Sequence, residues 1–281
     1  MELTERERQV SEEISKWELA QFASQGTDFS MTYQKWMNQA IQQLDPILKK
    51  RILSILDQTL FHIQASLQQS TFEQRSIENI FVEARIFRYD IDEIADLKKL
   101  SIDQVRFIAR KHLAKQRVVA LGQGGIAGGG GMLMYLSDLP LMLAINLRTV
   151  QLLAMIYGND MRRPYEMMLA LKVFHASSLP KHLQGAAWQE LLEENHHVQE
   201  EAFFYEGEEN VIAQSWIQQP LKQILKLLML RFARKKLIQG IPIAGIAIGA
   251  GMNYRFACEV SDVSHMFYQK RWLQEKMERR E

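Results

Sequence analysis

A few polar residues stand alone inside long apolar stretches of this chain. Asp138 and Arg148 are the only charged residues between positions 118 and 159. On one helix they would lie about 15 Å apart, too far for a direct ion pair. Each therefore needs another partner or a polar cavity. We favour Asp138 as the N-cap of a helix that begins at Leu139, with Arg148 meeting an acid from another helix. The alternative is a ligand pocket near Asp138, Arg148 and Asn253.

Two overlapping Glu-x-x-His pairs offer metal ligands, namely Glu193 with His196 and Glu194 with His197. Such pairs, taken from two helices, build the di-iron sites of some helical bundles. Here the two pairs overlap by one residue and so face different ways around one helix. A solvated helix surface explains them better, and we expect no metal, no cofactor and no catalytic residue.

One segment matches the residue pattern of a dinucleotide-binding motif but lacks the structural context that the motif requires. Gly122, Gly124 and Ala127 fit the G-x-G-x-x-A pattern that lets a backbone approach a pyrophosphate. That motif must follow a strand, whereas residues 111–117 continue a helical pattern. No second strand ending in an acid follows at the required distance, and this disfavours a nucleotide-dependent enzyme.

Glycines spaced four apart predict close helix contacts instead. Residues four apart share one face of a helix, and a face without side chains lets another backbone approach, as in many membrane helices. The pairs are Gly124 with Gly128 and Gly245 with Gly249. The surrounding segments, 118–137 and 237–254, contain no charged residue and approach the length of a membrane span. Hydropathy leaves open whether they span a membrane, dip into it or lie buried in protein.

The second uncharged segment follows a sharp change of charge. Residues 182–209 contain eight acids and no Lys or Arg, and residues 210–258 contain seven bases and no acid. The bases Arg234, Lys235 and Lys236 come directly before the apolar segment, an arrangement that suits an anionic membrane surface. The alternative is that these stretches pack against each other as oppositely charged helices.

The elements that must position these residues are helices. Capping boxes predict helix starts after Thr4, Ser70, Asp90 and Ser101, and proline predicts starts near positions 46, 164 and 220. We expect Gly158-Asn159-Asp160 to end an apolar helix and the last helix to begin near Asn253. No period-two alternation indicates strands. We therefore expect an all-α fold in which the two glycine-rich segments pack together. Residues 1–95 would form an N-terminal helical region and 96–281 a helical core, with a soft boundary that is compatible with one domain.

Composition narrows the functional classes. The chain has 281 residues, 47% of them hydrophobic, with 34 basic and 33 acidic residues and one cysteine. This composition excludes a disordered chain, and the balanced charge argues against nucleic-acid binding. A single cysteine cannot form an intramolecular disulfide and fits a reducing compartment. The charged N-terminus is unlike a secretory signal.

Several of these motifs resemble the EcsC family. The matching pieces are GQGGIAGGGG, SDLPLMLAINLRTVQLLAMIYGND and KKLIQGIPIAGIAIGAGMNYRF, and the similarity covers about residues 85–275. Its motif positions here are Asp138, Arg148, Tyr157, Gly158, Asp160, Pro242, Gly245, Gly249 and Asn253. The resemblance implies a bacterial intracellular protein connected with an ABC exporter or the membrane, and it supplies no catalytic residues.

These observations lead to one expected function and one alternative. We expect a non-enzymatic accessory protein in the cytoplasm, peripheral on or inserted in the inner face of the cell membrane. Its partners would be the membrane surface or ABC transporter subunits. The alternative is an enzyme or small-molecule-binding helical protein with a pocket near Asp138, Arg148 and Asn253. The sequence predicts no oligomeric state.

Overall fold

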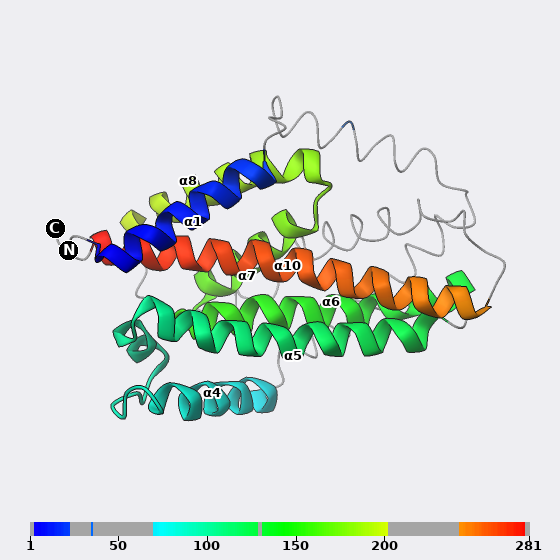
Figure 1. The fold of residues 1–281 in the computed structure, drawn as a ribbon, viewed down its shortest axis with the longest axis horizontal. Coiled ribbons are helices and arrows are strands. Elements are labelled where there is room, and N and C mark those ends of the chain that lie inside the picture. Colours follow the sequence, from blue (N-terminus) through cyan, green and yellow to red (C-terminus); the bar gives the residue numbers. More distant parts are fainter. Residues whose placement is uncertain (1–2, 23–34, 36–69, 129–130, 202–241, 279–281) are drawn as a thin grey trace.

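The computed structural model describes residues 3–22, 35, 70–128, 131–201 and 242–278, and this part of the chain is helical and contains no strand (Figure 1). The predicted all-α fold is confirmed. The elements are α1 (Glu5–Gln21), α4 (Ser70–Arg85), the 3₁₀ helix η1 (Ile94–Lys99), α5 (Ile102–Gly128), α6 (Gly131–Ile156), α7 (Pro164–Ser178), α8 (Lys181–Glu201) and α10 (Pro242–Glu278).

Three long helices, α5, α6 and α10, lie side by side and form the centre of the structure (Figure 1). Helix α4 packs on α5, while α7 packs on α6 and α10. Helix α1 contacts α10, and α8 contacts α7. The glycine-rich end of α5 and the glycine-rich start of α10 both lie at the end of the molecule that is remote from the start of α1 and the end of α10 (Figure 1). Among the described residues, no helix is apolar over a stretch long enough to cross a bilayer.

Several helix boundaries follow from local hydrogen bonds that the sequence predicts. The Glu7 amide donates to Thr4 Oγ1 at 3.3 Å and the Thr4 amide donates to Glu7 Oε2 at 2.9 Å, which completes the first capping box. Ser101 and Gln104 make the same reciprocal pair at the start of α5. Pro164 opens α7 as the first helical residue, where its missing amide hydrogen leaves no bond unmade.

Three predicted boundaries are wrong. Asp138 caps no helix start, because α6 begins at Gly131 and runs through Pro140. The last helix begins at Pro242 rather than near Asn253. Glu93, and not Asp90, is the N-cap residue of the short helix η1. Both α6 and α10 pack along α5 and against each other. We attribute the first two differences to this packing, which offsets the weak helix preference of glycine, roughly 1 kcal/mol against alanine.

The turn after α6 confirms one sequence signal. Gly158 adopts a φ of 83°, a left-handed conformation that favours glycine over any residue with a Cβ. The amide of Asn159 donates to the Ala154 carbonyl at 3.0 Å and thereby closes the helix end.

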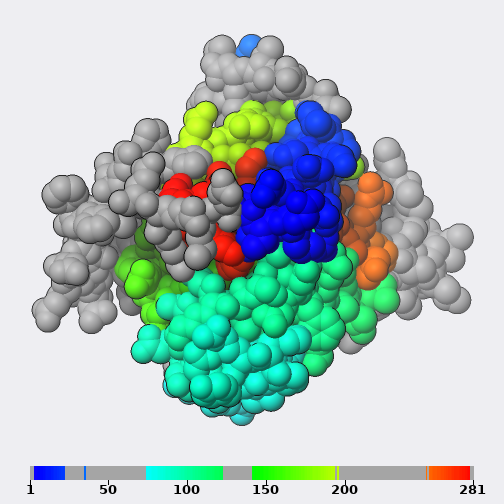
Figure 2. Space-filling view, turned by 60° about the vertical axis from the view of Figure 1, so that its left-hand side comes forward, coloured from blue at the N-terminus to red at the C-terminus, as the bar shows by residue number. Residues whose placement is uncertain are grey.

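The buried apolar core is continuous across the helices. Val10 and Ile14 of α1 belong to the same cluster as Tyr157 at the end of α6 and Phe267 of α10. Trp188 of α8 packs edge-on against Phe267 and Trp17. Figure 2 shows α1, in blue, seated against the red end of α10, with the cyan and green surface of α4 and α5 below it.

The predicted helices after Pro46 and Pro220 lie outside the described residues.

Candidate functional site

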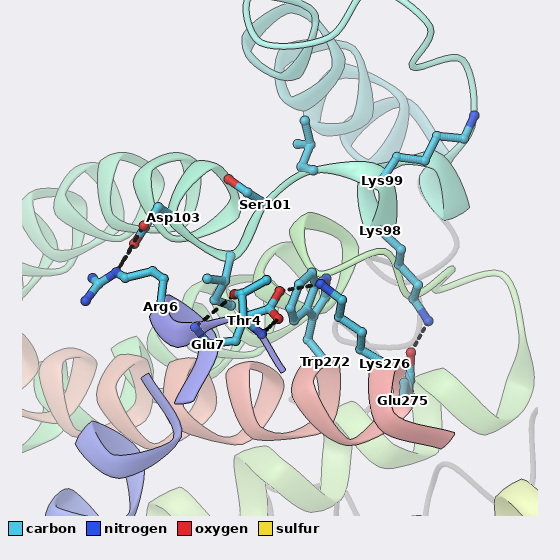
Figure 3. Close-up of a pocket in the computed structure, with 12 residues that line it drawn as sticks. Thr4, Arg6, Glu7, Lys98, Lys99, Ser101, Asp103, Trp272, Glu275 and Lys276 are labelled. Atoms are coloured by element: carbon cyan, nitrogen blue, oxygen red, sulfur yellow. Dashed lines mark hydrogen bonds and ion pairs between the residues drawn. The ribbon is translucent and has the colours of Figure 1, made fainter. Parts of the chain in front are cut away.

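A cleft of about 800 Å³ lies at the end of the molecule where α1 begins and α10 ends. The loop and helix start between η1 and α5 form its third wall (Figure 3). We call it the terminal cleft. Its polar lining residues are Thr4, Arg6, Glu7, Lys98, Lys99, Ser101, Asp103, Glu275 and Lys276, with Leu100, Ile102 and Trp272 as the apolar part.

The charges of the terminal cleft are paired across its walls. Lys98 of η1 binds Glu275 of α10, and Lys276 of α10 binds Glu7 of α1 (Figure 3). Burial opposes ionisation of Glu7, but hydrogen bonds from Lys276 and Thr4 outweigh it and hold the pKa of that carboxyl below its usual value. The Lys276 ammonium also lies 5.3 Å from the Trp272 ring centroid. These pairs join helices that are far apart in the sequence, and their first role is to hold this end of the bundle together.

A second, more basic cavity adjoins the first. It measures about 500 Å³ and is lined by Arg6, Asp103, Arg106, Phe107, Arg110 and Lys111. We call it the arginine groove. Arg6 and Asp103 line both cavities, and Arg6 Nε lies 3.0 Å from both oxygens of Asp103, so this ion pair is part of the wall between them.

A buried polar cluster lies behind the arginine groove. The Tyr157 hydroxyl is 3.3 Å from His265 Nδ1, and Tyr268 stacks on Tyr157 with ring centroids 6.5 Å apart. The Nε2 atom of His265 and the hydroxyl of Tyr268 have no hydrogen-bond partner among the described residues. Burial, reinforced by the positive charges of three arginines of α5, lowers the pKa of His265 to about 3. The histidine is therefore neutral at physiological pH.

The basic character of α5 explains that electrostatic effect. The arginines that act on His265 are Arg106, Arg110 and Arg117. Burial also raises the pKa of Tyr157 well above its ordinary value, and Arg106 and Arg110 oppose that rise. The interior next to α5 therefore disfavours any further positive charge.

One buried ion pair fixes α7 against α10. Arg271 donates to both carboxylate oxygens of Glu166 at 2.6 Å, and both side chains are buried. Arg271 Nε also lies 2.9 Å from Glu275, which connects this pair to the terminal cleft. Burial acts to lower the pKa of Arg271, but its bonds to Glu166 outweigh burial and raise that pKa above the ordinary value. Such paired geometry is typical of a structural contact, because neither group is left over to bind a ligand.

The predicted polar residues are dispersed rather than gathered in one pocket. Arg148 is half-buried on α6, and Asn253 is buried near the start of α10. Asp160 accepts two hydrogen bonds from Arg162 Nε at 2.9 and 3.0 Å, in the turn that follows α6. Neither of the two cavities is lined by Arg148, Asp160 or Asn253.

Other predicted residues fall where side chains are not described. Asp138, Gly124, Gly128, Gly245 and Gly249 lie in helical backbone, but their surroundings are outside the described side chains. The same holds for His196 and His197 of α8. Arg234, Lys235 and Lys236 lie outside the described residues altogether. Within the described part of the chain, no group of three His, Cys, Asp or Glu side chains could hold a metal ion.

Sequence reasoning missed the arginine groove. One signal was available, because no acidic residue occurs between Asp103 and Asp138 while α5 contains six Lys, Arg and His residues in that interval. Arg6 lies almost one hundred positions earlier in the chain, and nothing in the sequence around it indicates that it contributes to this groove.

The fold and its cavities define an all-α protein whose described residues include charged clefts but no recognised catalytic constellation. Comparison with known proteins gives the family. The sequence profile of the EcsC protein family matches residues 8–273, and the chain therefore belongs to the EcsC protein family, as the motifs predicted.

Two relatives come from Bacillus subtilis (strain 168). The uncharacterized protein YdbA is 26% identical over 282 residues, which cover 99% of this chain and 98% of that protein. Protein EcsC is 24% identical over 202 residues, which cover 72% of this chain and 76% of that protein. No solved structure matches.

Proposed function

We propose that this protein is a non-enzymatic accessory protein that binds the anionic cytoplasmic face of the cell membrane through the exposed side of α5. We define this surface, the α5 face, by Phe107, Arg110, Lys111, Lys115, Val118 and Leu121. The observation that supports the proposal is its composition. Phe107 is 58% exposed, Val118 67% and Leu121 43%, and the three basic residues are exposed beside them.

The helical repeat puts these residues on one side. Phe107 and Val118 are eleven residues apart, about three turns, and Leu121 lies one further turn along. Lys111 and Lys115 are four apart and lie beside the apolar residues. Figure 1 shows that the second half of α5 extends past α4, so α4 does not cover it.

Charge favours an anionic partner for this side. No acidic residue occurs in α5 after Asp103. Lys111 pairs with Glu83 of α4 at 3.1 Å, whereas Arg110 and Lys115 make no ion pair with the described part of the chain. Each basic residue near an anionic lipid surface contributes about 1 kcal/mol, and exposed apolar side chains add to this when they enter the headgroup region.

Attachment to the membrane surface would bring the protein to its expected partner, an ABC exporter. An alternative occupant of the α5 face is a subunit of that transporter. Membrane attachment is the better explanation, because isolated lysines and arginines next to exposed valine and leucine suit headgroups and acyl chains without shape complementarity.

Sedimentation with lipid vesicles tests this proposal. We expect the full chain to pellet with vesicles of phosphatidylcholine and phosphatidylglycerol, and to stay in the supernatant with phosphatidylcholine alone. The double variant Val118→Gln with Leu121→Gln should bind about tenfold more weakly, because it loses apolar contact with the lipid. Leu19→Gln is the control, since Leu19 is 75% exposed and belongs to α1 rather than to α5.

The outcomes separate the explanations. If neither vesicle retains the wild type, the membrane proposal is refuted. Equal weakening by Leu19→Gln and by the double variant would refute the assignment to the α5 face. If the protein binds membranes only when they contain the transporter, the α5 face is a protein-docking surface instead.

A further inference from the structure

The arginine groove has more positive charge than its own acids neutralise. Its lining includes four cationic side chains, Arg6, Arg106, Arg110 and Lys111, and one acid, Asp103. Asp103 is engaged by Arg6 at 3.0 Å, and two acids outside the lining, Glu13 and Glu83, pair with Arg106 and Lys111. The four cations therefore face three acids, which leaves an excess of one positive charge. Arg110 is exposed and has no hydrogen bond or ion pair with the described residues. A cavity of about 500 Å³ with this imbalance attracts anions.

Arg106 is the unusual member of the lining. The residue is only 6% exposed, yet its Nε and Nη1 atoms make no hydrogen bond to any described residue. Its Nη2 atom donates to Glu13 at 2.6 Å. A guanidinium has five N–H donors, and burying its charge is costly unless the charge is compensated. One half-exposed carboxylate is a small compensation for a buried arginine.

The positive charges of the groove also act on the neighbouring histidine. Burial lowers the pKa of His265, and Arg106 and Arg110 lower it further. The positive field of the groove therefore reaches into the core.

Glu13 shows that a carboxylate fits between two of the arginines. Its Oε1 atom lies 3.6 Å from Arg6 Nη1, and its Oε2 atom lies 2.6 Å from Arg106 Nη2. The Glu13 side chain is 47% exposed and can turn into solvent when a stronger anion arrives. A phosphate with two charges and three terminal oxygens satisfies several guanidinium groups at once, which a single carboxylate cannot do.

We propose that the arginine groove is a binding site for a phosphate monoester, with Arg6, Arg106 and Arg110 contacting the phosphate oxygens. Lys111 adds charge, and Phe107, which packs edge-on against Phe87, provides an apolar border for the rest of the ligand. The phosphate has two chemical sources, the headgroup of phosphatidic acid or a phosphorylated small molecule. The lipid source rests on the proposed function, because Phe107, Arg110 and Lys111 also belong to the α5 face. The small-molecule source does not.

Isothermal titration of the full chain with inorganic phosphate and with glycerol 3-phosphate tests the site directly. Arg110→Gln should weaken binding by about tenfold or more, since it removes a charged donor from the groove. Lys115→Gln removes the same charge from an exposed position of α5 outside the groove, and it should change affinity by less than about twofold. Circular dichroism confirms that each variant is folded.

Glu13→Gln should change phosphate affinity in the opposite direction to Arg110→Gln. It removes the competing carboxylate while keeping the side-chain length, so phosphate affinity should rise by about threefold or more. A merely structural role of Glu13 would not increase ligand binding. Unchanged or weaker binding in this variant would overturn the proposed geometry.

Vesicles distinguish the two sources. If the headgroup is the ligand, phosphatidic acid should retain the wild type more strongly than phosphatidylglycerol at equal surface charge, and Arg110→Gln should abolish that preference. If glycerol 3-phosphate binds and the vesicles show no preference, the ligand is a small molecule. Equal binding to both lipids with no binding of either soluble phosphate overturns the phosphate site and leaves the membrane proposal standing. Binding of soluble phosphate without any vesicle binding supports the phosphate site and overturns the membrane proposal.

Discussion

The buried histidine of α10 makes the stability of the fold depend on pH in a way that can be calculated. His265 has an ordinary pKa of 6.5 and a pKa of about 3 in the folded chain, because burial and then Arg106, Arg110 and Arg117 disfavour its charged form. Protonation therefore favours the unfolded chain. The resulting loss of stability is negligible above about pH 7 and grows as pH falls from 6.5 toward 3.

The magnitude at mildly acid pH follows directly. At pH 5 the unfolded chain has His265 almost fully protonated, whereas the folded chain has it almost fully neutral. The free energy of unfolding attributable to His265 is then about 2 kcal/mol lower than at neutral pH. This figure depends almost entirely on the unfolded pKa, because the folded-state value lies so far below pH 5.

His265→Gln isolates this contribution. Glutamine does not titrate, and it retains a polar group that can reach the Tyr157 hydroxyl. We expect urea unfolding to show that the wild type loses about 2 kcal/mol more than the variant between neutral pH and pH 5. His175, whose pKa burial lowers to about 4, is present in both proteins, and its contribution cancels in the comparison.

The pH experiment on His265→Gln has a control variant and an outcome that would contradict it. His182→Gln changes an exposed histidine of α8 and should leave the pH dependence of the wild type intact. If His265→Gln loses as much stability as the wild type on acidification, His265 does not remain neutral in the folded chain.

Three further predictions concern contacts that hold the helices in place, and urea unfolding measures each of them. Glu166→Gln should cost about 3–5 kcal/mol because it leaves the buried Arg271 with a weakened partner, while Glu166→Leu with Arg271→Met should cost clearly less; equal costs would contradict this. Gly158→Ala should cost about 1–3 kcal/mol, since its φ is positive and a Cβ would come within 2.5 Å of Lys98 Cγ; a neutral effect would mean that the turn relaxes. Thr4→Ala should cost about 1 kcal/mol by removing the cap of α1, and an unchanged midpoint would refute that role.

The sequence by itself determined the class of fold and many helix ends. Capping residues and proline act within one turn of the chain, so Thr4 with Glu7, Ser101 with Gln104, and Pro164 identify helix starts without knowledge of the rest. The glycine after α6 likewise identifies a helix end. The family motifs, spread over the apolar helices, were also visible in the sequence.

The same local rules misplaced the glycine-rich helices. Residues 242–252 have weak intrinsic helix preference, and Asp138 followed by Pro140 matches a helix start, so a local analysis begins these helices near Asn253 and at Leu139. The three-helix packing of α5, α6 and α10 supplies the stabilisation that overrides this preference.

The cavities depended on tertiary structure alone. The arginine groove needs Arg6 of α1 beside Asp103 and Arg106 of α5, and the terminal cleft needs Glu7 beside Lys276. Nothing in the spacing of these residues indicates that they meet, because the register between two helices is set by how their apolar faces pack. The charges of α5 were evident from the sequence, but only the packing of α1 on α10 turned them into a groove with a buried and incompletely compensated arginine.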